Sequence, residues 1–156
     1  MEGAGEMYNY LLFVHVMGAI IWVGGDVALQ VIGTRISRAD DPVQLAKFAG
    51  QVEWLGTRVL TPSAVVILIA GVFMVLDAWS FELLWVVIGL AGFSYSLVTG
   101  AVLLGPLSGK TGKLIEERGA EDPEVQGNIR KLFMYSRIEL GILIVVVFAM
   151  TVKPTL

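Results

Sequence analysis

The chain contains no cysteine and a single histidine. The absence of cysteine excludes disulfide bonds, thiolate metal ligands, iron–sulfur clusters and thiol nucleophiles. With one histidine, no serine has a second imidazole to activate it, and no His/Glu metal-protease spacing occurs. Any bound metal must therefore use that histidine, methionine, carboxylate, lysine or backbone oxygen.

Charged residues are scarce: 16% of the chain is charged, 56% is hydrophobic, and the mean hydropathy is +0.76. This composition is too apolar for an ordinary soluble domain. Four apolar stretches approach or exceed the roughly 20 residues that a helix needs to cross about 30 Å of hydrocarbon. They cover residues 8–33, 59–79, 83–104 and 133–152. Because they are continuously apolar, unlike alternating barrel strands, they predict helices. We expect an all-α, polytopic membrane protein, a four-transmembrane-helix bundle forming one transmembrane domain over 1–156.

The distribution of positive charge predicts the orientation of the bundle. An acidic leader, Met1–Glu6, precedes the first apolar stretch, which is too long for a typical signal peptide and should remain as a helix. Ten of the eleven basic residues lie in two connections, and Lys153 is the exception. The positive-inside rule makes those connections cytoplasmic, with both termini outside a bacterial inner membrane. The ten residues are Arg35, Arg38, Lys47, Arg58, Lys110, Lys113, Arg118, Arg130, Lys131 and Arg137.

Residues 42–56 read as a short amphipathic helix between the first two spans. Asp41 and Pro42 supply a cap and a first-turn proline, and an apolar stripe from Leu45 to Leu55 follows at helical spacing. Trp54 could anchor this segment at the membrane interface. We expect the helix to lie along the interface or to pack on the bundle as a linker. A second start signal, Glu121–Glu124, predicts a helix running into the last span.

Small residues on the third span predict close helix packing. Gly92, Ser96 and Gly100 recur every four residues, a spacing that lets a neighbouring helix approach. The favoured partner is another helix of the bundle, and a homodimer is the alternative.

Nucleotides and nucleic acids are not expected partners. The segment 105–111 looks like a phosphate-binding loop but has one spacer residue too few and follows no strand. The basic loops contain no recognisable nucleic-acid module, and orientation in the membrane already accounts for their charge.

The first span carries the most informative polar face. His15, Gly18, Trp22, Gly25 and Asp26 fall at offsets that place them on one side of a helix. Such a face should point into the bundle. Its glycines could admit a neighbouring helix or the edge of a flat cofactor, with His15 as a metal ligand. The alternative is that His15 and Asp26 hydrogen-bond to residues such as Tyr95, Ser96 or Thr99 and hold the helices in register.

Candidate partners for His15 are sought in the same half of the bundle. The predicted topology places Met74, Met150 and Lys153 there, and each could complete the coordination of a heme iron. A methionine in an apolar helix is, however, more often a packing residue.

Four charged residues could meet near the inner ends of the second and fourth spans: Glu53, Arg58, Arg137 and Glu139. An interfacial ion-pair cluster is the favoured interpretation, because paired charges there cost less than isolated ones. A proton route or a clamp for an anionic ligand is the alternative.

The run from His15 to Gly25 and the terminal Lys153–Pro154 carry a family resemblance. The chain resembles a group of small bacterial membrane proteins that includes HemJ-type protoporphyrinogen oxidases, copper-resistance D proteins and an uncharacterised four-helix branch, and it is most similar to that branch. The HemJ-type resemblance implies heme b, with His15 as candidate iron ligand. The chain departs from that pattern at Asp26–Leu29, where a basic-aromatic segment would stand, and it lacks further histidines.

The sequence thus supports three functional hypotheses. The first is a cytochrome b-like, heme b-binding protein serving electron transfer with a partner, redox sensing or porphyrin chemistry, as a heme-dependent membrane oxidoreductase. The candidate heme-binding residues are His15, Gly18, Trp22, Gly25, Met74, Met150 and Lys153. The second is a cofactor-free structural or accessory membrane protein, and the third is copper handling.

Overall fold

The computed structural model describes residues 2–39 and 41–154, and every regular element in this part of the chain is helical. The chain is an all-α membrane protein, as the sequence predicted. Its helices are α1 (Glu2–Arg38), α2 (Pro42–Leu55), η1 (Gly56–Leu60), α3 (Thr61–Ala78), α4 (Leu84–Val98), η2 (Thr99–Leu104), α5 (Gly105–Arg118) and α6 (Pro123–Val152).

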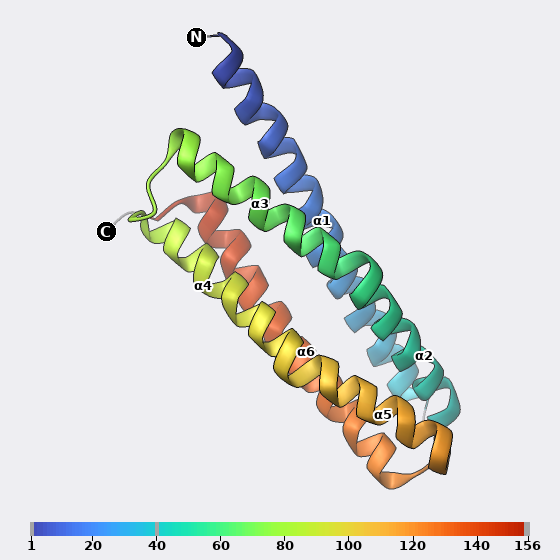
Figure 1. Cartoon of the computed structure of the whole chain (residues 1–156). Coiled ribbons are helices and arrows are strands. Elements are labelled where there is room, and N and C mark those ends of the chain that lie inside the picture. Colours follow the sequence, from blue (N-terminus) through green and yellow to red (C-terminus); the bar gives the residue numbers. More distant parts are fainter. Residues whose placement is uncertain (1, 40, 155–156) are drawn as a thin grey trace.

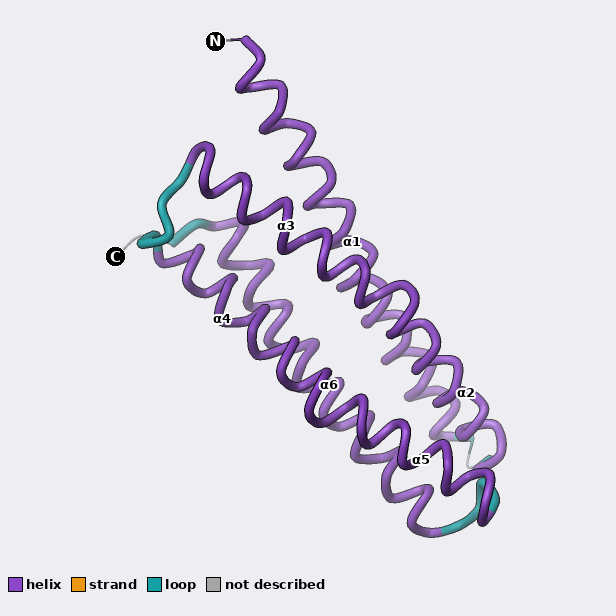
Figure 2. Tube along the Cα trace, viewed as in Figure 1, coloured by secondary structure: helices purple, strands orange, loops and turns teal. Residues whose placement is uncertain are grey.

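Within the described residues, four long helices are apolar enough to cross a membrane. Two of them are composite, because α2, η1 and α3 form one continuous helix and α4, η2 and α5 form another (Figures 1 and 2). Many large apolar side chains lie on the outside, among them Phe13, Leu76 and Val102, each more than 60% exposed. In a membrane these side chains contact lipid, which is why the interior of the bundle does not have to hold them.

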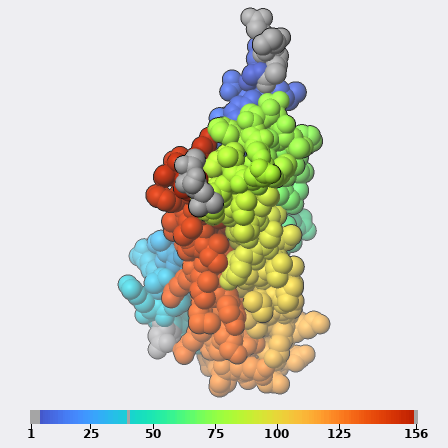
Figure 3. Space-filling view, turned by 90° about the vertical axis from the view of Figure 1, so that its left-hand side faces the viewer, coloured from blue at the N-terminus to red at the C-terminus, as the bar shows by residue number. Residues whose placement is uncertain are grey.

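The helices associate as two pairs. The first pair is α1 with α3, and the second is α4 with α6 (Figure 1). Figure 3 shows α4 and α6 side by side along one face of the molecule. We call the end that holds the turn 79–83 the turn end, and the opposite end, with both basic connections, the basic end.

Glycines set the approach within each pair. A Cβ at Gly18 would lie 2.7 Å from Cγ1 of Ile67 on α3, and a Cβ at Gly92 would collide with Val146 on α6. The expected close packing at Gly92 is therefore present inside the bundle. It does not extend to Gly100, where a Cβ would meet nothing within 4 Å.

A small core joins the two pairs at the basic end. Its buried residues come from α2, α5 and α6: Leu45, Ala46, Leu114, Val125 and Ile129. The carboxylate of Asp41 caps α2 as expected, accepting from the backbone N–H groups of Val43 and Gln44. Of the two expected placements for this helix, the structure shows packing on the bundle.

A second core closes the turn end. Val75 of α3 packs there with Trp85 and Val86 of α4, and Met150 of α6 lies against them. The backbone of Lys153 is left-handed, with φ of 50°, and its Nζ lies 4.0 Å from the ring centroid of Trp79. The two cores thus pack the two ends of the bundle, and the middle lies between them.

Both composite helices carry the same local irregularity in the middle. Residues 56–62 read GTRVLTP and residues 100–106 read GAVLLGP, so glycine, leucine and proline occupy matching positions. In each, the N–H just before the proline bonds to the carbonyl of the glycine five residues earlier, Thr61 to Gly56 and Gly105 to Gly100. Proline has no N–H and crowds the carbonyl four residues back. The helix accommodates it with π-type bonds, which widen the turn.

Candidate functional site

The bundle encloses a cavity of about 420 Å³ between the two helix pairs. This volume falls within the usual range of small-molecule sites. Residues of α1, α2, η1 and α3 line one side, and residues of α4, η2, α5 and α6 line the other. Both π-type segments border it, so the cavity lies where the composite helices are irregular.

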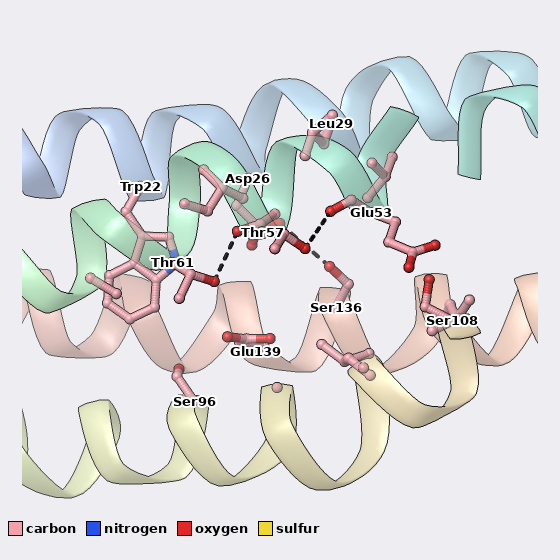
Figure 4. Close-up of a pocket in the computed structure, with 18 of the residues that line it drawn as sticks. Trp22, Asp26, Leu29, Glu53, Thr57, Thr61, Ser96, Ser108, Ser136 and Glu139 are labelled. Carbon is pink, nitrogen blue, oxygen red and sulfur yellow. Dashed lines mark hydrogen bonds between the residues drawn. The ribbon is translucent and has the colours of Figure 1, made fainter. Parts of the chain in front are cut away.

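The cavity is layered from the turn end to the basic end (Figure 4). Trp22 of α1 meets Phe93 of α4 edge to face, with ring centroids 6.0 Å apart. One turn further along the same helices come Asp26 and Ser96, since side chains three or four residues apart share a face. Glu139 of α6 lies in this polar layer (Figure 4). Glu53 of α2 and Ser108 of α5 border the basic end of the cavity.

Two carboxyl groups in the polar layer come from opposite helix pairs. Asp26 is only 7% exposed and accepts a hydrogen bond of 3.4 Å from the hydroxyl of Ser136 on α6. Glu139 stands one turn beyond Ser136 and is partly buried. An ionised carboxylate in apolar surroundings is costly unless a cation accompanies it. The pair must therefore be compensated by bound protons or by a positively charged ligand.

No basic side chain of the described residues forms an ion pair with these carboxyl groups. Among residues 2–39 and 41–154, the only ion pairs within 4 Å join Glu124 to Lys110 and to Arg118. These lie at the exposed basic end, where the hydrogen bond and charge of Lys110 lower the pKa of Glu124. The expected ion-pair cluster of Glu53, Arg58, Arg137 and Glu139 is therefore not formed, and that prediction is wrong. The guanidinium of Arg137 instead donates to the hydroxyl of Thr34.

Two further polar groups in the cavity wall have no hydrogen-bond partner in the described part of the chain. They are Oε1 of Gln30 and Oγ of Ser96, whose side chains are 9% and 4% exposed. Buried polar atoms are nearly always paired, so an orphan needs an explanation. Oγ of Ser96 lies beside the carboxyl group of Glu139. Oε1 of Gln30 borders the cavity, so a molecule inside it could supply the contact that this atom lacks.

The histidine face of α1 divides into two parts. His15 donates from Nδ1 to the carbonyl of Ile67 at 2.9 Å, and its ring fits against Gly71 of α3. Gly18 also faces α3, and Gly25 faces Leu60 of η1. The glycines thus admit a neighbouring helix, and the hydrogen bond fixes the register of the first pair, although the partner is not one of the three expected. Trp22 and Asp26 alone turn to the cavity.

The proposed second ligands of an iron at His15 have separate surroundings. The methyl group of Met150 packs against Gly89 on α4, and Lys153 lies over Trp79 and Trp85. These contacts belong mainly to the second helix pair, whereas His15 is held by the first. Met74, on α3, does not line the cavity. The structure therefore places Trp22 of the candidate heme residues in the cavity, and the others, including Gly18 and Gly25, outside it.

Sequence reasoning missed most of this site. It placed Glu139 in a charge cluster and gave Gln30 and Ser136 no role. A signal was available, since Glu139 stands within an apolar span and such residues normally face protein or a water-filled space. No three histidine or acidic side chains of the described residues converge as a metal site. The arrangement suits a proton or a single positive charge.

Comparison with known proteins gives one match. A family model described as a predicted integral membrane protein (DUF2269) matches residues 9–154. No curated protein and no solved structure matches the chain. The expected kinship with the uncharacterised four-helix branch is thus supported, while the relation to HemJ-type and copper-resistance proteins stays a prediction. Because the match covers nearly the whole sequence, the chain belongs to this family of integral membrane proteins.

Proposed function

We propose that this protein is a membrane-embedded carrier whose central cavity binds a monovalent cation in exchange for protons on Asp26 and Glu139. The observation that carries the proposal is the placement of two carboxyl groups, one from each helix pair, in one cavity with no basic partner among the described residues. Ionisable groups inside a membrane protein commonly mark ion pathways and proton relays.

Exchange follows from electrostatics. With the cavity empty, protons on the carboxyl groups avoid the cost of burying negative charge. A bound cation removes that cost, so the protons can leave as it arrives. Because the two groups come from different pairs, the charge state also bears on how strongly the pairs attract each other. Coupling between occupancy and the spacing of the pairs is what a carrier requires.

The carboxyl groups can be tested with a hydrophobic carbodiimide, which reacts with protonated carboxyl groups in apolar sites. We expect labelling of Asp26 or Glu139, declining as pH rises and absent in the Asp26→Asn/Glu139→Gln double variant. Glu82→Gln, at an exposed position of the turn end, is the matched control and should label like the parent. Mass spectrometry locates the adduct. Undiminished labelling in the double variant would exclude this pair as the protonated site.

Exchange itself can be measured as proton release. We expect cation addition to the purified protein, in weakly buffered detergent solution, to release about one proton per cation bound. Sodium, potassium, tetramethylammonium and tetraphenylphosphonium are the probes, and a pH-sensitive dye is the reporter. The double variant should release none. Absence of release with all four cations would overturn the exchange mechanism.

The contacts of His15 are those of a helix-packing residue. Its Nδ1–H bond to a backbone carbonyl leaves Nε2 as the basic nitrogen, as in metal-ligating histidines. Helix α3 nevertheless packs directly on this face, and the cavity begins further along α1. Heme b, with electron transfer or porphyrin oxidation, stays a prediction. A visible spectrum of the oxidised and reduced protein tests it, because a stoichiometric Soret band lost in His15→Ala would favour heme over the carrier.

Three further expectations from the sequence also stay predictions. Copper handling, a homodimer and an electron-transfer partner are predictions without support in the contacts described. We also propose that the protein resides in a bacterial inner membrane with its basic end in the cytoplasm, because the basic residues cluster in two connections.

A further inference from the structure

We propose that the cavity opens sideways into the lipid between η1 and η2, and that its ligand is a lipophilic organic cation that enters from the membrane. This inference rests on the proposed cation site and adds the substrate class and its route.

One side of the cavity is closed and the other is open. Helices α1 and α6 pack together, and the contacts of Asp26 with Ser136 and of Thr34 with Arg137 join them. On the opposite side several lining residues of both composite helices are exposed. A residue that borders a cavity and is also exposed stands at its opening. These residues are Glu53, Thr57, Thr61 and Val65 on one edge, and Leu97, Ala101 and Gly105 on the other.

Apart from Glu53 at its basic end, the edges of this opening are apolar in chemistry. The hydroxyl of Thr57 donates to the carbonyl of Glu53, and that of Thr61 donates to the carbonyl of Gly56, both at 2.9 Å. Each hydroxyl is thus satisfied within its own helix. Ala101 and Leu97 complete the opposite edge without a polar side chain. An opening of this kind is compatible with acyl chains and offers little to water, so it suits a ligand dissolved in lipid.

The π-type segments explain why the opening persists. Each keeps a proline inside a long helix by widening the turn, and each supplies a glycine beside the cavity, Gly56 in η1 and Gly100 in η2. A Cβ at Gly56 or Gly100 would meet nothing within 4 Å. The two edges are therefore spaced by backbone geometry, not by side chains that would have to move aside.

Inside the opening the lining is complementary to a hydrophobic cation. Asp26 and Glu139 provide negative charge, and Oε1 of Gln30 is an unpaired acceptor. Trp22 and Phe93 add aromatic rings beside the carboxyl layer, and aromatic rings attract cations through their π faces. In the part of the chain that the structure describes, no lysine or arginine lines the cavity, so an anionic headgroup would find no counter-charge there. The ligand is a protonated amine or an onium ion with apolar substituents.

The test uses the full chain in lipid nanodiscs with tetraphenylphosphonium as the lipophilic cation and tetramethylammonium as the hydrophilic one. We expect equilibrium dialysis to show saturable tetraphenylphosphonium binding, at least tenfold weaker in Asp26→Asn/Glu139→Gln. Tetramethylammonium should bind at least tenfold more weakly than tetraphenylphosphonium. The reverse preference, together with proton release, would overturn the substrate class while leaving cation exchange in place. Absence of binding and of proton release with both cations would overturn both proposals.

The route is tested with a matched pair of variants. Ala101→Phe adds a ring at the opening, whereas Val102→Phe adds the same ring at the neighbouring exposed position, which does not line the cavity. We expect Ala101→Phe to slow association of tetraphenylphosphonium at least tenfold in stopped-flow tryptophan fluorescence, and Val102→Phe to leave it unchanged. Ala101→Leu and Val102→Leu are a milder pair to be used if the ring lowers the melting temperature. Equal association rates in both members of a pair would overturn the lateral route.

Discussion

At the scale of single residues, neighbours decide what an acidic side chain does. Glu124 is exposed and paired with two cations, so it is an ordinary surface carboxylate. Asp26 is buried, and a serine hydroxyl at 3.4 Å is its hydrogen-bond donor. One hydroxyl does little to offset the desolvation of a full charge. The charge of Asp26 therefore has to be offset by a bound proton or a bound cation.

Gly18 offers a sharp test of residue-level packing. In Gly18→Leu the new side chain would begin 2.7 Å from Cγ1 of Ile67, so α1 and α3 must separate. Overpacking of this kind costs about 1–3 kcal/mol, and we expect a lower melting temperature in detergent by intrinsic fluorescence. Gly24→Leu is the control, because a Cβ there would meet nothing within 4 Å. Equal melting of both variants would contradict the assigned close approach.

The sequence predicted some of these residues and not others, for a physical reason. A histidine in an apolar span normally faces protein, and a glycine permits close approach of a neighbouring helix. His15 and Gly18 both meet a neighbour in this way. Helical spacing cannot predict which neighbour a residue meets, because it gives only the direction of the side chain around the axis of its own helix. The same face therefore packs on α3 at His15 and borders the cavity at Asp26. The place of Glu139 in the cavity could not be predicted in this way, because it depends on how α6 lies relative to α1.

At the scale of elements, the four long helices were predictable and their continuity was not. Lipid requires long apolar helices, so hydropathy identifies them directly. The amphipathic stripe of 42–56 could equally describe a helix on the membrane surface. Its union with α3 depends on η1, where a proline that would ordinarily break a helix is absorbed by π-type bonds.

The prolines are the testable part of that explanation. In Pro62→Ala and Pro106→Ala the missing N–H returns and the steric conflict disappears, which in a helix interior is worth about 3 kcal/mol. We expect the flanking turns to regain α-type bonds and to exchange their amide hydrogens more slowly. Hydrogen exchange with mass spectrometry on peptides covering 53–65 and 97–109 measures this.

The control is Pro42→Ala, at the first turn of α2, where a proline costs no helical hydrogen bond. It should leave exchange in both peptides unchanged. If Pro62→Ala and Pro106→Ala exchange like the parent, the π-type segments have a cause other than proline.

At the scale of the whole molecule, the division into two helix pairs gives the cavity its place. Packed cores fix the two ends, and the carboxyl groups face each other across the middle. Pairing α1 with α3 and α4 with α6 leaves η1 and η2 as the edges of an opening. Such an arrangement cannot be read from hydropathy, because every span is apolar around most of its circumference.

Orientation decides which leaflet and which compartment this opening serves. In the orientation proposed from the positive-inside rule the basic end lies in the cytoplasm. The π-type segments lie toward the basic ends of the predicted spans 59–79 and 83–104. The opening then faces the cytoplasmic leaflet, whose anionic lipids concentrate cationic amphiphiles near the surface. The opening would then lie where a lipophilic cation accumulates. The protons that leave Asp26 and Glu139 would pass through the rest of the bundle.

The cysteine-free chain allows this orientation to be tested directly. Glu82→Cys lies at the turn end and Glu117→Cys at the basic end, and both positions are exposed. We expect a membrane-impermeant maleimide to label Glu82→Cys in intact spheroplasts and to label Glu117→Cys only after the membrane is permeabilised. The parent chain is the blank, because it has no thiol. The opposite labelling pattern would place the opening in the outer leaflet, and the carrier would then have to load its cation from outside the cell.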